Sequence, residues 1–149
     1  MRYLLITLLF PLYCNAQYPI YTEINGGTGI TNIYNKEHQP MISLNVGRLL
    51  PLGSHGFADF QVGLAMPSIF TSKLLVGTWF NESKCVSLAG GFRLYPVAIC
   101  TQLMFGEPDG IQVQFSGEIG GTATRHSPSY EGMFNMGIRI PFKIKDEDE

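Results

Sequence analysis

The chain contains short stretches in which bulky apolar residues alternate with polar or small ones. Between Ile111 and Gly120, isoleucine, valine and phenylalanine occupy all the odd positions except Gly117, whereas glutamine, serine and glutamate occupy most of the even ones. A period of two is that of a β-strand, whose successive side chains point to opposite faces. The pattern predicts a strand with one bulky apolar face and one polar or small face.

The same two-faced pattern recurs from Tyr18 onward and predicts about eight strands. The fourth strand, expected over residues 73–80, is the least regular, because Leu75 and Trp79 break its alternation. Short connections are expected near Gly53, Asn81, Pro96 and Pro108, and longer loops at residues 31–39, 67–72 and 122–129. The pattern predicts no helix and a single domain.

The weaker face of these strands indicates which solvent surrounds the protein. In a soluble β-sheet protein this face meets water and is polar, but here it is mostly Gly, Ala, Ser, Gln and Asn. Charged residues make up 15% of the chain, against roughly 25% in soluble domains. Small and amide side chains suit the narrow lumen of a small barrel, and a bulky outer face suits lipid. We therefore expect an all-β fold, a closed antiparallel up-and-down transmembrane β-barrel of about eight strands.

The N-terminus predicts export. It combines a positive start at Arg2, an apolar run and a small-residue end at Ala16, which is the pattern of a cleaved signal peptide. The apolar run is about half of the ~20 residues that a membrane-spanning helix needs. We expect a signal peptide over residues 1–16, a barrel over residues 17–142 and an acidic C-terminal tail over residues 143–149.

Strand parity assigns five charged side chains to the barrel lumen: Glu23, Asp59, Arg93, Glu118 and Arg139. Charges in so narrow a lumen are costly unless they are paired, so we expect ion pairs and amide hydrogen bonds. Arg139 should contact Glu118 on the preceding strand, or Glu23 on the first strand, which closes against the last.

Aromatic residues gather at the strand ends that would share a rim with the chain termini. They are Tyr18, Phe57, Phe60, Trp79, Phe80, Phe105 and Phe142. A girdle of this kind is expected where a barrel crosses a membrane interface.

These features resemble the small outer-membrane β-barrel proteins of Gram-negative bacteria, the eight-stranded group that includes the OmpA transmembrane domain and OmpX-like proteins. The resemblance covers residues 18–142, and Gly137-Ile-Arg-Ile-Pro-Phe142 looks like the closing strand that such proteins present to their insertion machinery. It implies an outer-membrane protein with a structural or small surface role, a lumen plugged by side chains, and no catalysis or cofactor. Its implied partners are lipid, lipopolysaccharide and the barrel-insertion machinery. A net charge of −2 gives no case for a nucleic-acid partner.

Histidine and cysteine positions predict neither a metal site nor a disulfide. His38, His55 and His126 all fall in turns or loops without ligand spacing. Cys85 and Cys100 would lie far apart along two strands, which predicts free thiols in spite of export.

Two other functions remain open from the sequence. A secreted soluble β-barrel or sandwich that binds a small apolar ligand would also have two-faced strands. A lipid A-modifying hydrolase would need a nucleophile and a base. The segment Arg125-His-Ser-Pro-Ser129, with Glu131, contains the residue types of such a triad, although not the His-x-Ser spacing of lipid A deacylases.

Overall fold

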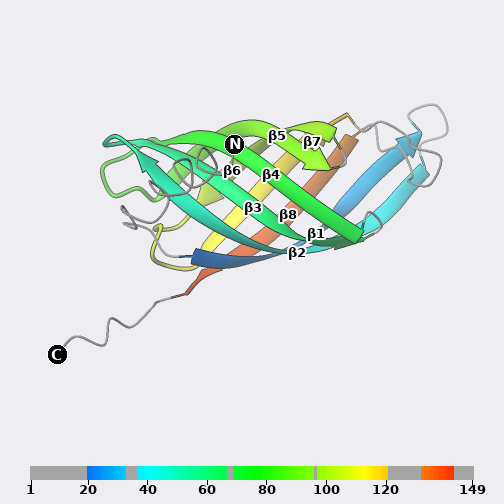
Figure 1. Ribbon diagram of the computed structural model, residues 1–149, viewed down its shortest axis with the longest axis horizontal. Helices are drawn as coiled ribbons and strands as arrows, with labels where there is room; N and C mark the ends of the chain where they lie inside the picture. The colour runs from blue at the N-terminus through cyan, green and yellow to red at the C-terminus, as the bar shows by residue number, and fades with distance from the viewer. Residues whose placement is uncertain (1–19, 33–36, 67–68, 96, 121–131, 143–149) are drawn as a thin grey trace, which may run out of the picture.

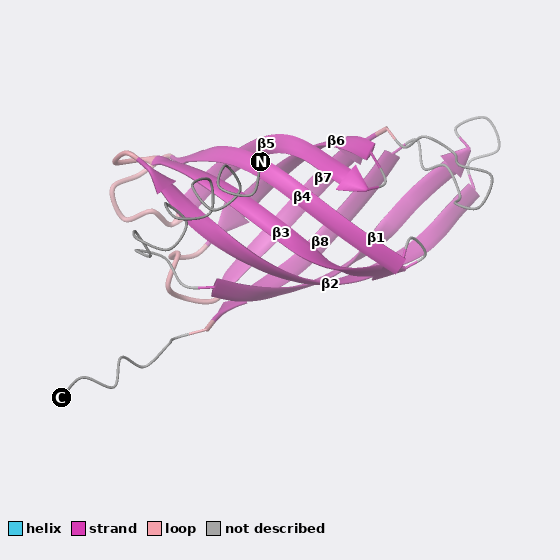
Figure 2. Ribbon diagram, in the orientation of Figure 1, coloured by secondary structure: helices cyan, strands magenta, loops and turns pink. Residues whose placement is uncertain are grey.

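The computed structural model describes residues 20–32, 37–66, 69–95, 97–120 and 132–142 (Figure 1). Their strands are β1 (Ile20–Asn32), β2 (Glu37–Leu52), β3 (Gly56–Met66), β4 (Ile69–Trp79), β5 (Val86–Tyr95), β6 (Val97–Phe105), β7 (Gln112–Ile119) and β8 (Gly132–Pro141). Each strand pairs antiparallel with the next, and β8 pairs with β1 to close the barrel. The predicted closed antiparallel barrel of eight strands is confirmed, and Figure 2 shows that the described elements are all strands. The described residues include no helix that is long and apolar enough to cross a membrane.

Both ends of the described chain lie at one end of the barrel, which we call the terminal rim (Figure 1). Closure continues past β8, since the Phe142 amide donates a hydrogen bond to the Ile20 carbonyl at 2.7 Å. Pro141, the last residue of β8, lies opposite Tyr21. A missing amide hydrogen is best tolerated at such a strand end. The opposite end of the barrel, where β1 leads into β2, is the loop rim.

Three strands are longer than the sequence pattern predicts. β1 extends to Asn32 and β2 begins at Glu37, so the loop expected at residues 31–39 is shorter. β4 begins at Ile69 instead of residue 73. Its register against β5 shifts between Ser72 and Lys73, and residues 71–73 are all buried. The shift leaves Leu94 of β5 without a partner in β4, and the consecutive residues Leu94 and Tyr95 are both exposed, as expected where one strand carries an extra residue.

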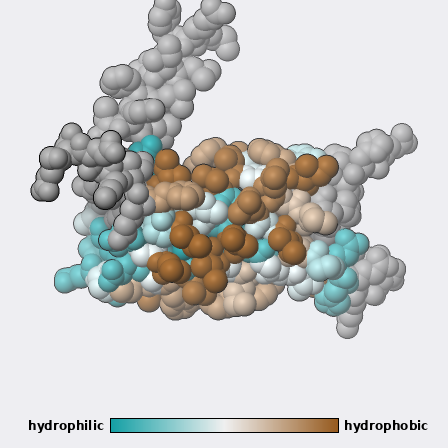
Figure 3. Space-filling view, turned by 90° about the horizontal axis from the view of Figure 1, so that it is seen from below, coloured by the Kyte–Doolittle hydropathy of each residue, from teal (hydrophilic) through white to brown (hydrophobic). Residues whose placement is uncertain are grey.

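The two faces of the barrel differ as the alternation predicts. Large apolar side chains, such as Leu44 at 49% and Phe134 at 56% exposure, cover the outside. Figure 3 shows apolar residues over the middle of one side of the barrel and hydrophilic residues toward both ends. Amide and charged side chains make up much of the inside, where Gln112 and Gln114 are fully buried, together with a set of buried apolar residues. The outer face of the barrel is therefore mostly apolar, and most polar strand residues face the lumen.

Candidate functional site in the barrel lumen

A cluster of Arg139, Glu23, Asp59 and Tyr21, here called the Arg139 cluster, fills the lumen toward the terminal rim. Nη2 of Arg139 lies 2.8 Å from Oε2 of Glu23 and 2.9 Å from Oδ2 of Asp59. The guanidinium carbon lies 3.7 Å from the centre of the Tyr21 ring, and the Tyr21 hydroxyl donates a hydrogen bond to Asp59. All four side chains are almost completely buried. The guanidinium of β8 therefore contacts a carboxylate and an aromatic ring of β1 and a carboxylate of β3.

Amide side chains complete the coordination of these carboxylates. Nδ2 of Asn25 donates to Oε1 of Glu23 at 2.8 Å, and Nδ2 of Asn45 donates to the same oxygen at 3.3 Å. Nε2 of Gln61 donates to Oδ2 of Asp59 at 2.9 Å. The buried acids thus receive the donors that water would otherwise supply.

A second ionic cluster, here called the Glu118 cluster, consists of Glu118, Lys73 and Arg93 and lies toward the loop rim. Oε1 of Glu118 is 2.9 Å from Nζ of Lys73 and 2.8 Å from Nη2 of Arg93. The other terminal nitrogen of Arg93 lies 3.7 Å from the sulfur of Met133. This cluster has the inverse composition of the Arg139 cluster, because two cations share one carboxylate.

Strand register explains which ion pairs form. Glu23 and Arg139 are direct partners across the β1–β8 closure, and the predicted contact between them is confirmed. The alternative contact with Glu118 is wrong. On the β7–β8 pair, Arg139 lies opposite Gln112 whereas Glu118 lies opposite Met133. Six residues along a strand correspond to about 20 Å, which is far beyond the reach of an ion pair.

Lys73 is the lumen charge that the sequence reasoning missed. Its side chain is 3% exposed and points to the same face as Leu75. The alternation from Lys73 to Trp79 contains the signal, since all four odd positions face the lumen or are glycine. The apolar character of Leu75 and Trp79 concealed it.

The lumen also contains an apolar cluster, which corrects the predicted aromatic girdle. Phe57 and Trp79 are buried inside the barrel, with ring centroids 5.1 Å apart, instead of lying at an outer interface. They pack in one cluster with Leu49, Leu75, Met104 and other residues. Gly77 makes this packing possible, because a Cβ atom there would lie 2.5 Å from the tip of the Phe57 ring. Parity, and not aromatic character, determines the face.

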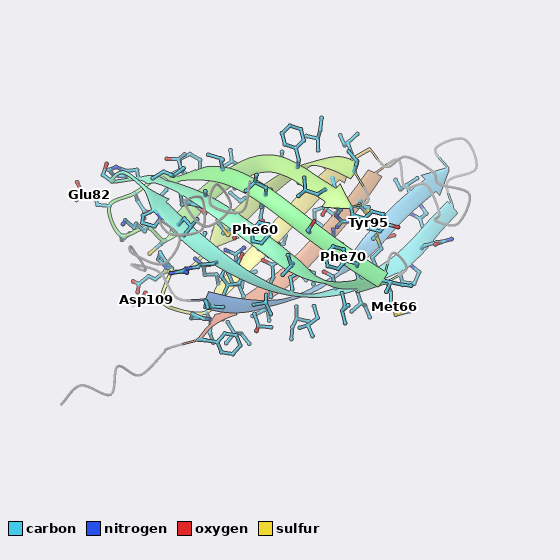
Figure 4. All side chains as sticks on the ribbon, in the orientation of Figure 1. Phe60, Met66, Phe70, Glu82, Tyr95 and Asp109 are labelled. Atoms are coloured by element: carbon cyan, nitrogen blue, oxygen red, sulfur yellow. The ribbon has the colours of Figure 1, made fainter. Side chains whose placement is uncertain are left out.

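Four members of the predicted girdle do point outward. Phe60, Phe80, Phe105 and Phe142 are each between 41% and 61% exposed, and Figure 4 shows Phe60 on the outside of the barrel. Tyr18 lies outside the described residues.

The remaining predicted features have different outcomes. Cys85 and Cys100 are free thiols, as predicted. No group of three or more potential metal ligands occurs in the part of the chain that the structure describes. The signal peptide, the acidic tail and the segment from Arg125 to Glu131 fall outside that part, so those expectations stay predictions.

The lumen arrangement can neutralise buried charge and fix the cross-section of the barrel. The two ionic clusters contain all six lumen charges of the described residues, and each of these charges has an opposite partner within 2.9 Å.

No protein-family model, curated protein or solved structure matches the chain.

Proposed function

We propose that this protein is an integral outer-membrane β-barrel with a structural or small surface role and no catalytic activity. The observation that carries the proposal is the inverted distribution of polarity. Exposed apolar side chains occur on the outer faces of all eight strands, whereas soluble monomers rarely expose contiguous apolar patches above a few hundred Å². Only one charged residue, Arg48, lies on the outer face among the strand residues whose side chains are described.

The filled lumen supports a role without a general pore. The Arg139 cluster, the Glu118 cluster and the apolar cluster, which also includes Tyr21, together occupy the interior, as expected for a barrel of only eight strands. The proposed partners are outer-membrane lipid, lipopolysaccharide and the insertion machinery. The signal peptide expected over residues 1–16 would direct export to that membrane.

Fractionation provides the first test. The protein should remain with the envelope in high salt, and its migration on a gel should change on boiling as the barrel unfolds. Release by salt alone would contradict the proposal.

A matched pair of substitutions tests the membrane environment more directly. Leu44 lies in the middle of β2 and Leu52 at its terminal-rim end, and their side chains are 49% and 52% exposed. In a bilayer, Leu44→Lys should cost about 2–4 kcal/mol of unfolding free energy and Leu52→Lys only about 0–1 kcal/mol. The rival soluble barrel predicts that both changes are nearly neutral, because both side chains would already meet water.

The hydrolase alternative has its own test. If the segment from Arg125 to Glu131 were catalytic, cells producing the protein should contain lipid A with fewer acyl chains. Cells producing the His126→Ala variant should then contain lipid A with the full number of acyl chains. Mass spectrometry of extracted lipid A measures both. Our proposal expects unchanged lipid A with and without the protein.

A further inference from the structure

Arg48 occupies an unusual position on the outside of the barrel. Its Cα is paired with Ile20 of β1 on one side and with Phe60 of β3 on the other. Both neighbours expose their side chains on the outer face. Residues on β2 that share the parity of Arg48, such as Val46, are also outward. The guanidinium is thus attached to an otherwise apolar surface.

The charge of Arg48 is not compensated by the described residues. The lumen carboxylates are on the opposite face of the sheet and bind other cations. Nε of Arg48 is buried and has no hydrogen-bond partner in the described part of the chain. Figure 4 shows Glu82 and Asp109 at the turns of the terminal rim, and no described ion pair joins either to Arg48. An arginine charge without a partner on an apolar surface is costly unless another molecule supplies an acceptor.

The depth of Arg48 identifies the kind of acceptor. Arg48 lies four positions before Leu52, the end of β2 at the terminal rim, which corresponds to about 13 Å along the strand and about 10 Å along a tilted barrel axis. A long arginine side chain that starts near a membrane interface extends toward the head groups. The outward ring of Phe60 beside it is typical of that interface.

We propose that Arg48 binds the phosphate of a phospholipid head group in the leaflet at the terminal rim. This inference rests on the proposed membrane function. A guanidinium fork matches the geometry of a phosphate and forms two charge-assisted hydrogen bonds with it. The acyl chains of the same lipid would cover the apolar side chains around Arg48, such as Ile20 and Val46, so that one ligand satisfies both the charge and the surface.

Purified barrel in maltoside micelles, which contain no phosphate, allows a direct test. Phosphatidylglycerol is titrated in, and native mass spectrometry measures bound lipid while thermal unfolding measures the midpoint shift. Wild-type protein should retain phosphatidylglycerol and unfold at a higher temperature. Arg48→Gln should weaken binding about tenfold or more, and Arg48→Lys should fall between them because it keeps the charge but loses the fork. Lys84→Gln, which removes a cation from a turn at the same rim, should bind as wild type.

Four outcomes decide the matter. Equal retention of phosphatidylglycerol by wild type and Arg48→Gln would overturn the inference and leave the membrane function standing. Equal weakening by Lys84→Gln would mean general attraction of the rim for anions and would also overturn it. A midpoint shift of the same size with inorganic phosphate alone would indicate a free-phosphate site in place of a lipid site. Wild-type protein that stays folded and monodisperse without any detergent would refute the proposed function itself. If Arg48→Gln fails to fold, the comparison of Arg48→Lys with wild type still tests the fork.

Discussion

Replacing Arg139 with leucine should destabilise the barrel more than replacing any other lumen cation. The change removes the one cation that binds both Glu23 and Asp59, and it also removes the contact with the Tyr21 ring. Leucine fills part of the space without supplying a donor. Two acids would then remain buried, with amide and hydroxyl donors as their only close partners.

The expected magnitude follows from this count of partners. Removing one member of a buried ion pair typically costs about 3–5 kcal/mol, and here two carboxylates lose the same partner, so we expect the upper part of that range. Arg93→Leu is the matched control. It leaves Glu118 with Lys73 at 2.9 Å, so it should cost about 1.5–3 kcal/mol, the range of one charge-assisted hydrogen bond.

Urea unfolding of the micelle-embedded barrel measures both changes. Trp79 is the only tryptophan of the chain and is buried in the lumen, so its fluorescence reports unfolding without a label. Wild type and both variants should have the same slope with urea and different midpoints. A loss below about 1 kcal/mol for Arg139→Leu, or equal losses for the two variants, would refute the assignment of Arg139 as the shared partner.

Two further predictions concern the wall and the thiols. Gly137→Ala should lower the unfolding free energy by about 1–3 kcal/mol through overpacking, because a Cβ there would overlap the Asn25 amide oxygen. Gly26→Ala should be close to neutral, since a Cβ there would have nothing within 4 Å. Urea unfolding midpoints compare the two variants, and equal losses would contradict the lumen packing. A maleimide should label the half-buried Cys85 in the folded protein and Cys100 only after unfolding, and mass spectrometry of the folded protein showing rapid double labelling would argue against the buried position of Cys100.

The alternation of side chains along each strand correctly predicts which charged residues face the lumen. It correctly placed Glu23, Asp59, Arg93, Glu118 and Arg139 inside, because one closed sheet allows each strand only two faces. The closure of an even-stranded barrel also predicted the contact between Glu23 and Arg139, since the first and last strands must pair.

Features that depend on strand register or on local irregularity cannot be predicted from the alternation. The choice between Glu23 and Glu118 as partner of Arg139 depends on the stagger of β7 against β8, which alternation does not encode. Lys73 lies on the same face as Leu75 and Trp79, and the apolar character of these two residues conceals the parity that places Lys73 in the lumen. The aromatic character of Phe57 predicts an interface position, but its parity with Asp59 places it in the lumen. The space that Gly77 leaves for its ring exists only when β3 and β4 are aligned.

Because the two ionic clusters have inverse compositions, the net charge of the lumen depends on residues that lie far apart in the chain. The Arg139 cluster carries one excess negative charge and the Glu118 cluster one excess positive charge, so the described lumen is neutral only as a whole: three acids and three bases, Glu23, Asp59, Glu118, Lys73, Arg93 and Arg139. A neutralising substitution at Asp59 leaves a surplus cation in a low-dielectric interior, where charges interact over long distances, and a second loss at Lys73 would remove that surplus. Barrels that descend from a common ancestor with this one should therefore lose or gain these acids and bases in pairs, even where the two residues do not touch.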